Sequence, residues 1–147
     1  MAVGDDRDAY SARNFDVDLG GESIGFAEVS GLGFELDDTG NAIVRRVGNV
    51  TLRRAVTGDL ALWSWVRRTL DGALKSSTVK VTLLDSQREP VCVWELREAR
   101  PVRWNGPDFD ALGGGDIAME EVVLAAEGLE FRSARPTEPR RSPKRRP

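Results

Sequence analysis

The chain has 147 residues and a net charge of −3, with 40% hydrophobic and 31% charged side chains, a composition typical of one soluble globular domain. It contains no histidine, which excludes serine–histidine triads and imidazole-based metal sites. The single cysteine, Cys92, excludes an internal disulfide, and no apolar run approaches the roughly 20 residues of a membrane-spanning helix.

The chain begins with a polar segment, and we predict that residues 1–13 form a flexible N-terminal arm. Its acidic start, Met1 to Asp6, lacks the apolar stretch of a secretory signal. The lone cysteine suits a reducing compartment. We therefore expect no signal peptide and a reducing compartment such as the cytoplasm.

Alternating apolar residues predict the first strands of the domain. Phe15, Val17 and Leu19 share one face of a strand. Gly20-Gly21 indicates a hairpin turn, and the next strand is predicted over residues 24–30.

A second group of short elements follows. Residues 34–36 are predicted as a short strand and residues 37–41 as a turn. Ile43 and Val44 are predicted to lead back into the strand that precedes the helix.

The stretch from Gly48 to Gly72 combines a strand with the one helix that the sequence predicts. Val50 and Leu52 alternate with polar residues, as in a strand. Residues 57–59 then supply acceptors for free amides at a helix start, and Gly72 is a stop signal. The spacing predicts a buried stripe made of Leu60, Trp63, Val66 and Leu70.

The four tryptophans are predicted to differ in role. Trp63 lies on the helical stripe and Trp94 on a strand face, so both are predicted to be core residues. Trp65 lies off the stripe and Trp104 precedes a turn. Either of these two is predicted to be partly exposed and available to a partner.

Strands dominate the rest of the domain. Residues 78–85 alternate, and the next strand opens at Pro90 and continues past a bulge to Trp104. Residues 108–116 are predicted to form a loop, and residues 117–129 one long strand that is apolar on both faces. Seven or eight strands and one helix favour a mainly β barrel or sandwich that the helix flanks.

The sequence offers no convincing catalytic, cofactor-binding or metal-binding residue. Cys92 lies among apolar residues of a strand, which predicts a buried structural thiol. Residues 113–116 lack the features of a phosphate-binding loop. Glu120–Glu121 would point to opposite faces of a strand, and Asp108 and Asp110 are interpreted as turn formers. We expect no enzymatic activity and no cofactor.

Charge divides the chain into two parts. Residues 132–147 contain seven Lys or Arg and one Glu, a net charge of +6, whereas residues 1–131 contain 14 Lys or Arg and 23 Asp or Glu, a net charge of −9. The tail also contains four prolines and almost nothing apolar. We predict that the domain covers residues 14–131 and that residues 132–147 are a disordered basic tail.

Motifs in the first half of the domain resemble the contractile-tail phage tube protein family. FDVDLG at residues 15–20 and GFAEVSGL at residues 25–32 are similar to its F-x-V-x-[IL]-G and F-x-E-V-S-G-L segments. NVTLRR at residues 49–54 and LWSW at residues 62–65 are similar to its T-L-K-R-G strand and L-W-x-W helix.

Two motifs in the second half extend this resemblance in the same order. ARPVRWNGP at residues 99–107 is similar to A-x-P-x-K-W-x-G-P, and EEVVLAAEGLE at residues 120–130 is similar to the closing E-x-x-E-L-x-H-E-G-L-E. The matches cover residues 14–131. The resemblance therefore extends over the whole predicted domain.

The resemblance implies a phage tail tube-like β-barrel with one helix, related in fold to the type VI secretion tube protein. Such subunits form six-membered rings that stack into a hollow tube inside a contractile sheath. The implied partners are further copies of the chain, sheath and baseplate proteins, and cargo in the lumen. The implied location is a phage tail or an injection particle, with no specific nucleic-acid partner.

Three departures from the family pattern leave alternatives open. Residues 37–47 form a short segment without K-L-P-G, Ala55 stands where glycine is common, and the basic tail is additional. One alternative is a specialised ring at the baseplate end, or a cap or adaptor ring. An alternative of another class is a small β-barrel that captures acidic partners through its basic tail.

Overall fold

The computed structural model describes residues 9–38 and 40–134. This part of the chain contains ten strands and one helix, α2 (Ala61–Leu70). The strands are β1 (Phe15–Leu19), β2 (Glu22–Ile24), β3 (Glu28–Ser30), β4 (Phe34–Asp38), β5 (Ile43–Val47), β6 (Val50–Ala55), β7 (Ser77–Leu84), β8 (Pro90–Asn105), β9 (Met119–Ala125) and β10 (Gly128–Ser133).

Eight strands form one sheet in the order β2-β1-β7-β8-β9-β6-β3, with β10 also paired to β8. All the pairs are antiparallel. β4 and β5 form a separate two-stranded hairpin. The eight-stranded sheet and the helix confirm the predicted mainly β fold with one flanking helix, and the hairpin adds two strands to the predicted number.

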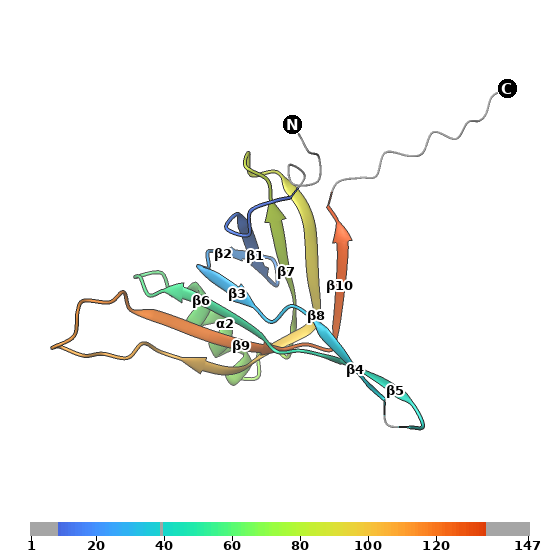
Figure 1. Cartoon of the computed structure of the whole chain (residues 1–147). Coiled ribbons are helices and arrows are strands. Elements are labelled where there is room, and N and C mark those ends of the chain that lie inside the picture. The colour runs from blue at the N-terminus through green and yellow to red at the C-terminus, as the bar shows by residue number, and fades with distance from the viewer. Residues whose placement is uncertain (1–8, 39, 135–147) are drawn as a thin grey trace.

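The long strand β8 divides this sheet into two layers. Its first part pairs with β7 and β10, and its last part, from Arg100 to Asn105, pairs with β9. Figure 1 shows β7, β8 and β10 standing upright and β6 and β9 running across below them. We call these the upright layer and the lower layer.

A bulge marks the place where β8 passes from one layer to the other. Glu98 has a positive φ of 54°, and the register between β7 and β8 shifts between Ser77 and Val79. The predicted bulge before Ala99 is therefore confirmed. A bulge strengthens local twist and bends a strand, so one strand can serve two differently oriented layers.

The helix packs against the core between the two layers, with a face that only partly overlaps the predicted stripe. Its buried residues are Leu62, Trp65 and Val66, whereas Leu60 and Leu70 are exposed. Val66 of the predicted stripe is buried and Trp63 is partly buried, but Leu60 and Leu70 were wrongly predicted, because the helix is apolar on two adjoining faces. Positions 62, 65 and 66 follow the helical period as well as the stripe that begins at Leu60.

Trp65 is the core tryptophan of this helix. It is 1% exposed, so the prediction that it is partly exposed was wrong. Trp63 is partly buried against the same core. The core that they meet contains residues of both layers: Val17, Leu19, Ile24, Val50, Leu52, Val79, Val81, Leu96, Ala99, Val122 and Leu124.

Three predicted continuous strands are each divided in two. The prediction over residues 24–30 becomes β2, which pairs with β1, and β3, which pairs with β6. Residues 43–55 become β5 and β6, and residues 117–129 become β9 and part of β10. In each case the chain changes its pairing partner, and apolar alternation within one segment does not report that change.

The last strand ends close to the predicted domain boundary. β10 runs to Ser133, two residues beyond the predicted domain boundary at residue 131. The predicted arm and tail lie largely outside the described residues, which leave out residues 1–8 and 135–147. Within the part of the chain that the structure describes, no helix is long and apolar enough to cross a membrane.

Candidate assembly surfaces

The residues considered for chemistry do not come together in a reactive site. Among the described residues, no group of three or more Cys, Asp or Glu is arranged to hold a metal ion. Cys92 is only partly buried in β8, so its predicted full burial was wrong. It lies in register opposite Ser133 of β10, two positions before Trp94 on the upright layer.

The glycine-rich segment between β8 and β9 forms a loop, as predicted. A side-chain oxygen of Asp110 accepts a hydrogen bond from the amide of Leu112 at 3.0 Å, and its carbonyl accepts one from the amide of Gly113 at 3.0 Å. Asp110 is therefore a turn former. We call residues 106–118 the β8–β9 loop.

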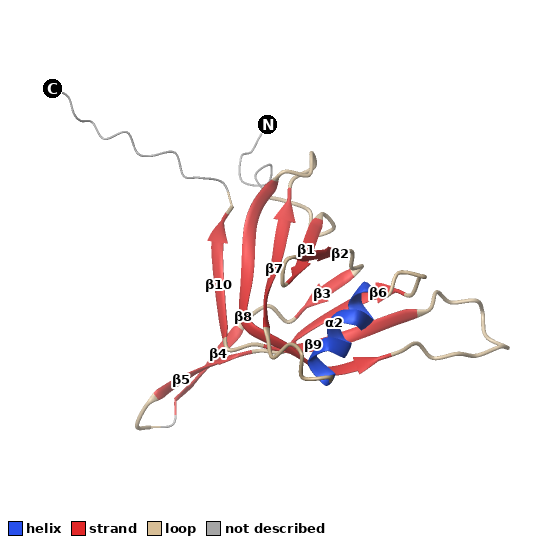
Figure 2. Cartoon of the chain, turned by 180° about the vertical axis from the view of Figure 1, so that it is seen from behind, coloured by secondary structure: helices blue, strands red, loops and turns tan. Residues whose placement is uncertain are grey.

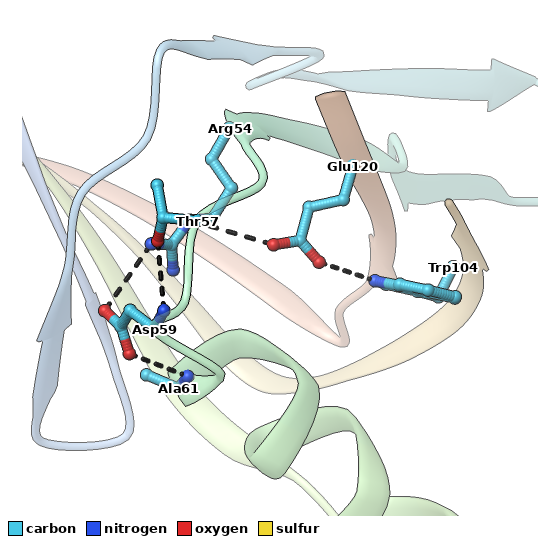
Figure 3. Close-up of polar contacts among 6 residues, drawn as sticks. All are labelled: Arg54, Thr57, Asp59, Ala61, Trp104 and Glu120. Atoms are coloured by element: carbon cyan, nitrogen blue, oxygen red, sulfur yellow. Dashed lines mark hydrogen bonds and ion pairs between the residues drawn. The ribbon is translucent and has the colours of Figure 1, made fainter. Parts of the chain in front are cut away.

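Glu120 and Glu121 point to opposite faces of β9, as predicted, and meet different partners. Glu120 is 8% exposed and accepts a hydrogen bond from the indole nitrogen of Trp104 at 3.1 Å (Figure 3). Its other oxygen lies 3.8 Å from Nε of Arg54. Glu121 instead lies 3.7 Å from the guanidinium of Arg53 on the more exposed face.

Arg54 extends this contact toward the start of the helix. Its Nη2 lies 3.5 Å from a carboxylate oxygen of Asp59. Asp59 also accepts a hydrogen bond from the amide of Ala61 at 3.0 Å, and its own amide donates to the hydroxyl of Thr57 (Figure 3). Thus Asp59 provides the predicted acceptor for a helix amide and links the helix start to β6, whereas Thr57 accepts from Asp59 itself.

This group of residues joins β6, β9 and the start of the helix. Arg54 and Glu120 are both buried, and Nη1 of Arg54 has no hydrogen-bond partner among the described residues. Removal of one member of such a buried pair would leave the other charge buried and unpaired. Since Trp104 and Glu120 stand on either side of the β8–β9 loop, the contacts hold the base of that loop to the helix start.

The β4–β5 hairpin carries exposed apolar side chains on one face. The register places Phe34 opposite Val47 and Leu36 opposite Arg45, so these residues share a face with Ile43. Phe34, Leu36 and Ile43 are 51%, 60% and 67% exposed. Figures 1 and 2 show the hairpin projecting away from both layers. Such a surface is typical of a protein–protein contact.

The β8–β9 loop is a second exposed apolar element. Phe109 is 85% exposed, Leu112 is 96% exposed and Ile117 is 74% exposed. Figures 1 and 2 show the loop extending beyond the ends of β8 and β9. This surface could have been predicted from the sequence. Large apolar residues occur there between glycines and aspartates, in a segment with no strand or helix pattern.

The sheet also has open edges. In the described chain, β2, β3 and β10 each have one neighbouring strand, and the last part of β8 pairs only with β9. An edge strand presents unpaired backbone N–H and C=O groups that can pair with another chain. The molecule therefore offers open edges on both layers for association.

Comparison with protein families gives one match that covers most of the chain. The model of the family described as T4-like virus tail tube protein gp19 matches residues 11–130. A search among curated proteins gave no match.

Solved structures with a similar fold come from contractile particles. A chain in the sheath–tube complex of PVC, an extracellular contractile injection system, in its extended state is 24% identical, with 90% of this chain and 99% of that chain covered and a TM-score of 0.72. A chain in the tube-terminating cap of the anti-feeding prophage is 23% identical, with 91% and 95% covered and a TM-score of 0.74. A chain in the PVC sheath/tube terminator is 26% identical, with 84% and 96% covered and a TM-score of 0.71.

Proposed function

The chain belongs to the T4-like virus tail tube protein gp19 family, and on that basis we propose that it is a structural subunit of the inner tube of a contractile injection particle or phage tail. Six copies form a ring, and rings stack into a hollow tube inside a sheath. The tube conducts cargo when the sheath contracts. The chain acts by assembly and not by catalysis.

The observation that carries this proposal is the set of open strand edges on a sheet that does not close within one subunit. An exposed edge favours pairing with another chain, and a closed ring of identical subunits removes every such edge. Edge pairing between neighbours would join their sheets into one continuous wall. A ring with a lumen follows from that closure.

The β4–β5 hairpin supports contact between rings. Its apolar face has no covering element in the described chain, and it projects from the body of the subunit. Residues 37–47 are short for this family, yet they contribute to a regular hairpin in which Arg46 and Asp37 form an ion pair at 2.7 Å. This ion pair lies on the face opposite Phe34, Leu36 and Ile43.

The proposed partners follow from this role. They are copies of the chain in the same and adjacent rings, a surrounding sheath, and baseplate proteins at one end. Assembly takes place in the cytoplasm, and the product is part of a phage tail or injection particle.

A specialised end ring is the second candidate. Similar solved chains occur in a tube-terminating cap, a sheath/tube terminator and a baseplate. A tube subunit must use both ring faces, whereas a terminal ring must stop growth at one face. The two roles therefore differ in the length of the assembly that the purified protein forms.

Electron microscopy and mass measurement of the purified full chain test the proposal. Rings of six subunits with a central hole, stacked into tubes of variable length, are expected for a tube subunit. Single rings or short stacks of fixed length favour the end-ring role. Monomers at every accessible concentration, both alone and with preformed tube ends added, would contradict both roles.

A further inference from the structure

The β8–β9 loop presents an apolar tip with acidic flanks. The turn at Asp110 leaves the neighbouring Leu112 almost completely exposed, and Phe109 is 85% exposed. The loop contains Asp108, Asp110 and Asp116 but no Lys or Arg. Because burial of large apolar side chains is favourable, the exposed tip is suited to a contact that one subunit does not provide.

A complementary groove lies between α2 and the last part of β8. It has a volume of about 290 Å³ and is lined by Trp63, Val66, Leu70, Pro101, Val102, Arg103 and Trp104. The rings of Trp63 and Trp104 are in contact, with centroids 4.9 Å apart. An apolar cavity of about 150 Å³ can hold a benzene ring, so this groove can accommodate a phenylalanine side chain.

Charge at the groove is opposite to charge on the loop. Arg103 lines the groove and is exposed, and it takes part in no ion pair among the described residues. Arg67, on the last turn of α2 next to Val66, adds a second positive charge, although it pairs with Asp71. An acidic segment is therefore attracted to the groove, and complementary charge fixes orientation.

We propose that the β8–β9 loop of one copy docks into the α2–β8 groove of the next copy, with Phe109 and Leu112 as apolar anchors and Asp108 facing Arg103. The inference rests on the proposed assembly function and names two surfaces that would meet within it. The loop does not occupy the groove of its own subunit, because Phe109 and Leu112 are exposed and the loop extends away from the body (Figure 2).

This contact is heterologous, because a loop on one copy meets a different surface on the next. Heterologous contacts produce closed rings when the rotation between copies closes, and open filaments when it does not. The Arg54–Glu120–Trp104 contacts give the loop a fixed base and also place Trp104 in the groove. One buried group therefore positions both halves of the proposed contact.

Disulfide trapping between single-cysteine variants tests the contact. In a Cys92→Ser background, Leu112→Cys and Val102→Cys are prepared separately, mixed under assembly conditions and oxidised. A cross-linked dimer in the mixture, absent from either variant alone, is expected. Gln87→Cys replaces Val102→Cys as the control, because Gln87 lies in the exposed turn between β7 and β8.

The outcomes separate this inference from the proposed function. Rings that form normally while the mixture gives no more cross-linking than the Gln87→Cys control would overturn the loop–groove contact and leave the ring proposal standing. Dimers of Leu112→Cys alone would also overturn it, since they would indicate a symmetric contact between loops. Absence of rings from the wild-type chain would contradict the proposed function itself.

Charge exchange tests the Asp108–Arg103 pairing. Exposed ion pairs contribute about 0.2–1 kcal/mol, so Asp108→Lys or Arg103→Glu is expected to raise the concentration for half-maximal assembly by about 1.4- to 5-fold. The double variant is expected to return to within about twofold of the wild type. Glu89→Lys combined with Arg103→Glu is the control and should give no recovery. A double variant no better than the worse single variant would overturn this pairing.

Discussion

The indole nitrogen of Trp65 donates a hydrogen bond to the hydroxyl of Ser77 at 3.2 Å, joining the helix to the first residue of β7. Trp65 is 1% exposed and packs among residues of both layers. This contact explains why a tryptophan, rather than an aliphatic residue, occupies the centre of the helix. A buried indole needs a partner for its N–H, and the sheet provides one.

Replacement of Trp65 by Ala is expected to reduce the free energy of unfolding by about 3–5 kcal/mol, because it removes a large buried side chain. Trp63→Ala is expected to cause a smaller loss, since Trp63 is only partly buried. Leu70→Ala, at a residue 69% exposed, is the control and should change stability by less than about 0.5 kcal/mol. Chemical denaturation measures all three. An equal effect of Trp63→Ala and Trp65→Ala would contradict the observed helix orientation.

The contact between Arg54 and Glu120 predicts strong coupling between two substitutions. The side chains are 9% and 10% exposed, and removal of one member of a buried ion pair costs about 3–5 kcal/mol because the other charge stays buried. The losses of unfolding free energy caused by Arg54→Met and by Glu120→Leu should therefore add up to more than the loss caused by the double variant. A double-mutant cycle from unfolding curves measures the coupling, and additive effects would be evidence against it.

Gly31 is predicted to be intolerant of a side chain. It has a φ of +94°, and a Cβ added there would overlap the backbone carbonyl oxygen of Asn49. Backbone strain of this kind alone costs about 1–3 kcal/mol, so Gly31→Ala should lower the melting temperature. Gly33→Ala is the matched control, since an added Cβ meets nothing within 4 Å. Equal melting temperatures for the two variants would show that the backbone relaxes freely at Gly31.

Polar substitution on the β4–β5 hairpin should affect stacking without affecting folding. Phe34 and Ile43 are more than half exposed, so Phe34→Ser and Ile43→Ser should leave the melting temperature of the isolated subunit nearly unchanged. We expect shorter tubes, or single rings, in electron micrographs. Glu89→Ser, in the turn before β8, is the control. Normal tube lengths with both hairpin variants would rule out this face as the stacking surface.

Two truncations of the C-terminal segment are expected to differ in their effect on the melting temperature. Removal of residues 135–147 should not lower the melting temperature, because this segment has little apolar content to bury. Truncation before Arg132 should lower it, because it removes the Arg132–Glu95 ion pair and the backbone hydrogen bond from Ala134 to Val91.

The basic charge of the tail can be tested separately in assembly. Incorporation of the chain lacking residues 135–147 into particles is measured at low and moderate salt. If the tail binds an acidic partner, the truncated chain should be incorporated less than the full chain at low salt only, since salt screens such attraction. Equal incorporation of the two chains at both salt levels would leave the tail without this role.

The sequence predicted the elements that depend on local pattern. The alternation in β1 and in the first part of β7 was sufficient because each has one clearly buried face. The Gly20-Gly21 turn was predicted for the same local reason, since both glycines have positive φ. The expected order of family motifs then identified a tail tube fold that the strand count alone left undecided.

The errors arose where tertiary structure selects between equivalent local patterns. The helix is apolar on two adjoining faces, and only the position of Ser77 and the sheet decides that Trp65 is buried. Likewise, Ile24 and Val29 lie in one alternating segment but pair with strands of different layers. The separate hairpin was missed because Ile43 and Val44 were predicted to lead into the strand before the helix, whereas they pair with β4.

The passage of β8 through both layers gives the subunit a direction of mechanical strength. The strand has 16 residues, a contour length of about 50 Å, and its backbone is covalently continuous across the bend at Glu98. Tension along β8 loads its ladders with β7, β10 and β9 in shear, so many hydrogen bonds must break together. Tension across the strands would instead open the ladders one bond at a time. We therefore expect a subunit pulled along β8 to unfold at higher force than one pulled across it.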